Sequence, residues 1–150
     1  MTKVRRMSLE ELDMNNIYKI LSDNLTKEEI ETVNFCFWVT FFAENFLKKI
    51  LSKLFRKLVK DHHKGDPLFE EFIDTVVNEH YFMGKIGIFK TMKVHGFEEF
   101  LKLSGELNAI RNRIAHGKLK DLSFRGKPIN LPKTKQKILD LLIDAINKSS

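Results

Sequence analysis

Residues 26–60 contain neither proline nor glycine, and this long uninterrupted segment restricts the chain to folds built around one long helix. Thr26 followed by Glu29 is a capping-box pattern, which opens a helix, so we expect this helix to run from Thr26 to about Lys60. The whole chain of 150 residues has only three prolines and seven glycines, which favours long helices elsewhere too. The sequence therefore predicts an all-α protein.

The remaining elements follow from apolar periodicity and from helix start and stop signals. We expect helices at Ser8 to about Asn24, from Asp66-Pro67 through Val77, at Tyr81 to about Val94, at Phe97 to His116, and at Lys133 to Asn147. Residues 118–131 should form a loop or hairpin around Arg125-Gly126. The length suits one domain with a real core. We predict a single domain over residues 1–150, an up-and-down bundle of about five to six helices, with residues 1–7 as a flexible N-terminus.

The first half of the long helix carries apolar side chains on nearly every side, namely Phe35, Phe37, Trp38, Val39, Phe41 and Phe42. A helix that is apolar all round is buried all round. In a small bundle this predicts either a central helix or a subunit interface, and we favour the interface. Further along, the face that carried Phe35, Trp38 and Phe42 carries cations instead: Lys49, Lys53, Arg56 and Lys60.

The net charge of +6 is unevenly distributed along the chain. Residues 48–64 hold seven lysines or arginines against Asp61 alone, and residues 111–137 hold nine against Asp121 alone. Residues 65–110, by contrast, hold eight acids and four lysines. Gathered positive charge is typical of a surface that binds a polyanion, so we expect RNA or another nucleic acid as a partner. A plain solvated face is the alternative interpretation.

Nothing in the chain predicts secretion or membrane insertion. Residues 1–10 carry three cations with no apolar segment behind them, and the longest apolar run, Phe35 to Ala43, is too short to span a bilayer. The single cysteine, Cys36, lies in that apolar run and suits a small buried side chain. These features indicate a cytoplasmic protein with no disulfide framework.

One charged residue interrupts an apolar stripe. On an ideal helix, Arg111 falls within the stripe formed by Phe100, Leu103, Leu107, Ile110 and Ile114. A guanidinium group cannot lose its charge, so it needs a carboxylate, a set of carbonyl groups, a partner subunit or a bound phosphate. Arg111 therefore requires a partner that the stripe itself does not supply.

The segment from Arg111 to His116 resembles the signature of the HEPN superfamily, in which an arginine, a polar residue and then a histidine lie near a helix end. Here these residues are Arg111, Asn112 and His116. More loosely, the resemblance covers residues 28–148, including the segment Gly84-Lys85-Ile86. It implies a metal-independent endoribonuclease without a cofactor, used in a toxin-antitoxin or antiviral defence module. It also implies a homodimer with a composite site, and an antitoxin or other inhibitory protein is a possible partner.

The chemistry of these side chains agrees with that expectation. A histidine exchanges protons near neutral pH, so His116 can act as general base or acid on the 2′-hydroxyl of RNA. Arg111 can stabilise the charge on phosphorus, and Asn112 can orient the imidazole or hold a phosphate oxygen. Five helical residues turn Arg111 and His116 apart by about 140°. We therefore expect a homodimer whose interface contains residues 111–116.

Several further residues complete the predicted site. Glu44 lies on an inward side of the long helix and either pairs with Arg111 or caps a neighbouring helix. The predicted RNA contacts are Arg113, Lys118, Lys120, Arg125 and Lys127, although Arg113 points away from Arg111 and fits a plain surface role equally. No metal site is expected, because His62 and His63 lack other ligands.

Three alternatives stay open. His116 suits a helix C-terminus simply because the helix dipole favours a cation there. The domain can be an inactive HEPN-like domain that binds RNA or a partner protein, or a helical interaction module in which Arg111 forms an internal ion pair.

One departure from the family also matters. HEPN toxins silenced by a nucleotidyltransferase have a tyrosine two residues after the histidine, where this chain has Lys118.

Overall fold

The computed structural model describes residues 23–58, 65–79 and 81–149. The described residues form five helices and one two-stranded hairpin, which confirms the predicted all-α bundle. The elements are α2 (Lys27–Leu58), α3 (Pro67–Glu79), α4 (Phe82–Thr91), α5 (Glu98–Ala115), β1 (Ser123–Phe124), β2 (Lys127–Pro128) and α6 (Pro132–Lys148). The helix predicted at Ser8 to Asn24 lies almost entirely outside the described residues, as does the predicted flexible segment 1–7.

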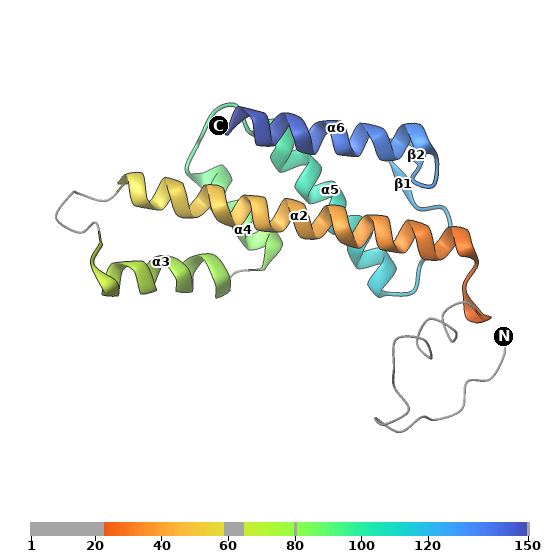
Figure 1. Cartoon of the computed structure of the whole chain (residues 1–150), viewed down its shortest axis with the longest axis horizontal. Coiled ribbons are helices and arrows are strands. Elements are labelled where there is room, and N and C mark those ends of the chain that lie inside the picture. The colour runs from red at the N-terminus through yellow and green to blue at the C-terminus, as the bar shows by residue number, and fades with distance from the viewer. Residues whose placement is uncertain (1–22, 59–64, 80, 150) are drawn as a thin grey trace, which may run out of the picture.

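The long helix α2 organises the bundle. It crosses the molecule in Figure 1 and contacts each of the other four described helices. α3 returns alongside its C-terminal half, α4 and α5 pack behind it, and α6 runs in the same direction as α2 (Figure 1). The core therefore lies along one side of α2, between α2 and α5. The other three helices, α3, α4 and α6, each pack against α2.

The helix bounds agree with the sequence signals to within a few residues. Thr26 and Glu29 form the expected capping box, in which the Glu29 amide donates to Thr26 Oγ1 at 3.1 Å and the Thr26 amide donates to Glu29 Oε1 at 3.2 Å. α3 begins at Pro67 as predicted. α4 is shorter than expected and ends at Thr91, shortly before Lys93 adopts a left-handed backbone conformation with a φ of 53°.

The hairpin before α6 was also predicted. Arg125 and Gly126 connect β1 and β2 with φ values of 51° and 78°, a combination that belongs to the tight turn preferred by two-residue hairpins.

Cys36 is buried against the core, and this burial raises the pKa of its thiol to about 11. It therefore serves as a small apolar side chain, as the sequence indicates.

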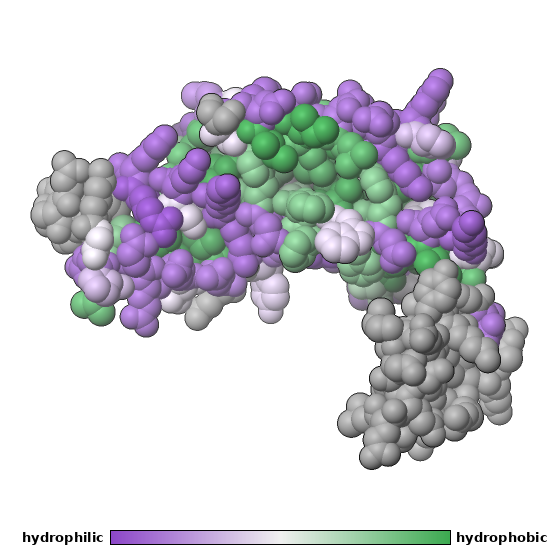
Figure 2. All heavy atoms as spheres, viewed as in Figure 1, coloured by the Kyte–Doolittle hydropathy of each residue, from purple (hydrophilic) through white to green (hydrophobic). Residues whose placement is uncertain are grey.

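The aromatic segment of α2 is only partly enclosed by its own chain. Its outer side chains are exposed, by 45% for Phe37, 62% for Trp38, 56% for Phe41 and 59% for Phe42. Leu139, Ile143 and Ile146 of α6 are exposed as well. Figure 2 shows hydrophobic residues gathered over the middle of α2 and α6, bordered by hydrophilic residues. The aromatic segment is therefore not buried on all sides within one chain: α2 is central in the bundle, but its outer side is left exposed, as the favoured interpretation of a subunit interface requires.

Within the described ranges, none of the helices combines the length and apolar character that crossing a membrane requires.

Candidate functional site

Arg111 lies one turn before the end of α5 and faces α2. Its Nη1 donates to Glu44 Oε2 at 3.3 Å, and its Nη2 donates to Asn108 Oδ1 at 2.8 Å. The side chain is 31% exposed, so Arg111 is held by the protein and is still accessible to solvent. This contact confirms the predicted pair with Glu44, and the alternative in which Glu44 caps a neighbouring helix is wrong.

A second cation, which sequence reasoning missed, reaches the same carboxylate. Lys85 in the middle of α4 is only 2% exposed, and its Nζ lies 3.0 Å from Glu44 Oε1. The two oxygens of Glu44 therefore bind two cations that come from two different helices. The sequence held two signals, the Gly84-Lys85-Ile86 segment of the resemblance and a lysine in an otherwise apolar segment, but that segment gave no clear helical face and so no partner for Lys85.

The charges of this cluster are unbalanced, since one carboxylate faces two cations. Burial alone would raise the pKa of Glu44, but the hydrogen bonds and charges of Lys85 and then Arg111 outweigh burial and lower the pKa below its usual value. Glu44 is therefore ionised at neutral pH, and the cluster keeps a surplus of one positive charge. A surplus of positive charge in a partly exposed site favours an anionic ligand.

Two neighbours restrict the guanidinium further. The Arg111 carbon Cζ lies 5.7 Å from the centre of the Phe82 ring, within the range of a cation–π contact. Asn108, which accepts the second hydrogen bond, is itself buried. The guanidinium is thus held by a carboxylate, an amide oxygen and an aromatic ring, contributed by three helices.

His116 is positioned by the end of α5. The amide of Gly117 donates to the Ile114 carbonyl and that of Lys118 donates to the Arg113 carbonyl, both at 2.9 Å, while Gly117 has a φ of +73°. This pair of bonds is the Schellman arrangement with Gly117 in the left-handed position, and it ends the helix where the sequence predicts, at about His116. His116 is the residue between the helix and the cap, and it is exposed.

The signature residues do not form one site within a single chain. Asn112 and His116 are both exposed, and no contact found among the described residues joins the His116 imidazole to Arg111 or to Asn112. A regular helix runs through Ala115, so the predicted divergence of the two side chains is retained. The helix thus presents the guanidinium toward α2 and α4 and leaves the imidazole in solvent.

The predicted RNA contacts divide into two groups. Lys118, Lys120 and Lys127 are exposed, and Arg113 is exposed while donating to the Lys120 carbonyl at 3.5 Å. Arg125 has a different environment. Its Nη2 lies 2.9 Å from Glu106 Oε1 and 2.5 Å from Glu99 Oε1, and its Cζ lies 4.9 Å from the Phe124 ring centre. This arrangement favours a role in holding the hairpin on α5 over the predicted contact with phosphate.

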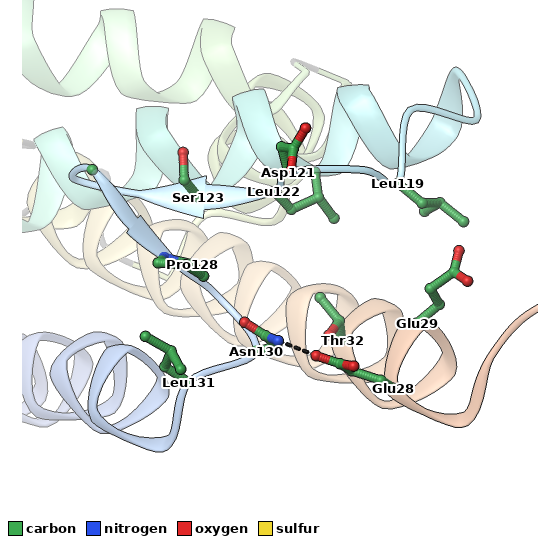
Figure 3. A pocket seen from close by; sticks show the side chains of 11 residues that line it. Glu28, Glu29, Thr32, Leu119, Asp121, Leu122, Ser123, Pro128, Asn130 and Leu131 are labelled. Carbon is green, nitrogen blue, oxygen red and sulfur yellow. Dashed lines mark hydrogen bonds between the residues drawn. The ribbon is translucent and has the colours of Figure 1, made fainter.

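A cleft of about 600 Å³ lies beside the start of α2. Figure 3 shows the side chains that line it, which come from the start of α2, residues 119–123 and the loop before α6. Its acidic side chains are Glu28, Glu29 and Asp121, and Asn130 donates to Glu28 across one edge. Carboxylates repel phosphate, so this cleft is a poorer candidate for an RNA backbone than the Arg111 cluster.

Among the described residues, no three histidine, cysteine or carboxylate side chains lie close enough together to hold a metal ion. Comparison with family models, with curated proteins and with solved structures finds no match to this chain. The inference of a function consequently depends on the residues and geometry described above.

Proposed function

We propose that this chain is a HEPN-type, metal-independent endoribonuclease that acts as a homodimer. The observation that carries the proposal is Arg111, whose partly exposed side chain is fixed by Glu44 and Asn108 in a cluster with surplus positive charge. Five residues later, at the C-terminal cap of the same helix, His116 offers an exposed imidazole close in sequence to exposed lysines. An anchored cation and a proton-exchanging group are what cleavage of a phosphodiester through a neighbouring hydroxyl requires, and in this proposal the two groups in one site come from two chains.

The proposed reaction is a transesterification within the RNA. The imidazole of His116 takes the proton of a 2′-hydroxyl, and the 2′-oxygen attacks the adjacent phosphorus. Arg111 stabilises the additional negative charge that develops on the phosphate oxygens. The bond to the 5′-oxygen breaks, and this oxygen receives a proton from an imidazolium. The products are a 2′,3′-cyclic phosphate and a 5′-hydroxyl end.

A second copy completes the site in this proposal. Phe41 and Phe37 lie three and seven residues before Glu44 on the same side of α2, and both are exposed. Tyr81 and Met83, the neighbours of Phe82, are exposed by 89% and 53%. Exposed apolar side chains therefore lie on the two helices that contribute Glu44 and Phe82 to the Arg111 cluster, and exposed apolar residues of this kind are typical of a protein interface. A two-fold dimer there would bring the divergent Arg111 and His116 side chains of two chains into one cleft.

The biological setting follows from the HEPN resemblance. We propose a cytoplasmic role in a toxin-antitoxin or antiviral defence module, with a separate inhibitory protein to restrain the nuclease. Because Lys118 stands where the nucleotidyltransferase-regulated toxins have tyrosine, modification at that position is not part of the proposal.

The test is incubation of the purified protein with mixed cellular RNA in EDTA, beside Arg111→Ala and His116→Ala variants shown to be folded and dimeric. We expect the wild type alone to cleave, leaving cyclic phosphate ends. Loss of cleavage in EDTA that returns with a divalent ion would contradict the metal-independent mechanism, and equal cleavage by His116→Ala would exclude the assigned base.

A second candidate is an inactive HEPN-like domain that binds RNA or a partner protein. It is favoured by the exposed position of His116, whose imidazole has no described contact with Arg111. This candidate predicts RNA binding that weakens steeply with salt, no cleavage by the wild type, and no change in binding for His116→Ala. RNA binding without cleavage by a confirmed dimer would select it.

A further inference from the structure

Lys85 is the one nearly fully buried cation described in the structure, and the proposed cleavage reaction does not use it. It shares α4 with Phe82, Ile86 and Phe89, each of which is also buried. An ammonium group in such surroundings is costly unless it is paired, and replacing a buried ion pair by apolar side chains is often neutral or stabilising. Stability alone therefore gives little reason for a lysine at this position, which directs attention to its contact with the neighbouring site.

We propose that Lys85 is a positioning residue for the nuclease proposed above: it fixes the Glu44 carboxylate, which in turn fixes the Arg111 guanidinium. The inference depends on that proposed function. Its basis is geometric. Lys85 Nζ lies 3.0 Å from Glu44 Oε1, and Arg111 Nη1 lies 3.3 Å from Glu44 Oε2. Each oxygen therefore has its own cation, and the carboxylate cannot turn without breaking one of the two contacts.

The consequence for Arg111 follows from the shape of its side chain. A guanidinium group prefers to bind both oxygens of a carboxylate through two parallel hydrogen bonds. With Lys85 holding Oε1, Arg111 makes only one hydrogen bond to Glu44 and uses another donor for Asn108 at 2.8 Å. Without Lys85, Oε1 would be free, and Arg111 would move to bind both oxygens. The guanidinium would then leave the position in which part of it faces solvent.

Four variants separate positioning from simple structural support. Lys85→Met removes the ammonium, Glu44→Gln removes the carboxylate, and a double variant removes both charges. Lys90→Met, on the same helix but exposed, is the matched control. Thermal melting and the kcat and KM for cleavage of a defined RNA would be measured for each. We expect Lys85→Met to lower kcat/KM about tenfold to a hundredfold, as losses of supporting contacts around a site typically do.

Folded Lys85→Met, which keeps the Glu44 carboxylate, decides between the two roles. A positioning role predicts a lower kcat/KM, whereas a role in the fold alone predicts a lower melting temperature with unchanged kcat/KM. The double variant tests the dependence on Glu44. It buries no unpaired charge, so we expect its melting temperature to recover toward the wild-type value while its kcat/KM stays low, because Arg111 still lacks its carboxylate. Recovery of both stability and cleavage would overturn the proposal, since the Glu44 carboxylate would then not be needed to fix Arg111. Unchanged kcat/KM in folded Lys85→Met would overturn it as well.

A measurement without RNA distinguishes failure of this proposal from failure of the nuclease. The Nε–H resonance of Arg111, assigned by comparison with Arg111→Lys, reports whether the guanidinium is immobilised. We expect an ordered signal in the wild type and in Lys90→Met, and a shifted or mobile signal in Lys85→Met. If the wild type does not cleave RNA but this difference is seen, the nuclease proposal fails and the positioning of Arg111 stands. An identical signal in Lys85→Met would refute the positioning itself.

Discussion

At the residue scale, Glu44 decides much of the behaviour of this molecule. It is 26% exposed and joins α2 to α4 through Lys85 and to α5 through Arg111. Burial favours a higher pKa for Glu44, but the contacts with Lys85 and then Arg111 together outweigh burial and lower this pKa. Removing it would leave the Lys85 ammonium buried without its partner, which is among the more costly changes that a single substitution can make.

We therefore predict that Glu44→Gln lowers the free energy of unfolding by about 3 kcal/mol at neutral pH. The folded-state pKa of Glu44 lies below the unfolded value, so its contribution is fully present above about pH 4.5 and is lost as the pH falls through the folded-state pKa. The stability difference between wild type and Glu44→Gln should shrink with acidification from pH 6 to pH 3, measured by denaturant unfolding. A difference that does not change with pH would contradict this account.

The sequence predicted some side-chain partners and not others. The pairing of Arg111 with Glu44 was one of two alternatives that the sequence offered for Glu44, because each of these residues interrupts an inward face of a helix with clear periodicity. Lys85 was not assigned, because Gly84 and Gly87 weaken the periodicity of its helix. Arg125 was expected to bind RNA, but its contacts with Glu99 and Glu106 depend on how the hairpin folds back onto α5. Such long-range contacts leave no local pattern in the sequence.

At the scale of the elements, helix ends were predicted well where a single residue determines them. Thr26, Pro67 and Gly117 each mark the expected terminus, since capping depends on local hydrogen bonds and backbone angles. The end of α4 was less well predicted, because Lys93 adopts a left-handed conformation that its residue type does not favour. A strong local signal therefore determines where a helix ends, and the remaining helix ends depend on tertiary packing.

Replacing two glycines by alanine, one inside α5 and one in its cap, should change the stability of the protein in opposite directions. At Gly117 the φ of +73° strains any side chain, so Gly117→Ala should destabilise the protein by about 1 kcal/mol. Gly105, inside α5, has no heavy atom within 4 Å of an added Cβ, so Gly105→Ala should stabilise by about 0.5–1 kcal/mol. Thermal melting of both variants tests the pair. Equal shifts of the same sign would refute the described cap.

At the scale of the whole molecule, the exposed apolar residues near the site predict association. Phe41→Glu places a charge one turn from Glu44, where we propose that a second copy packs, and should convert a dimer into a monomer and abolish cleavage. The matched control is Leu68→Glu on α3, which exposes the same charge at an apolar residue that is 76% exposed. Light scattering coupled to size-exclusion chromatography measures both. A wild type that is monomeric at working concentrations and still cleaves RNA would exclude the composite site.

The contacts of α2 with helices far along the chain also bear on how the chain is made. Of its partners, α3 and α4 follow α2 soon, but α5 and α6 follow much later in the sequence. Leu47 and Leu51 of α2 are buried in the same core as Ile138 and Leu142 of α6. During synthesis the apolar residues of α2 are therefore made before some of the helices that cover them, and apolar surface exposed at that stage promotes aggregation. The cluster around Arg111 is likewise assembled late, so unfinished chains lack a formed site.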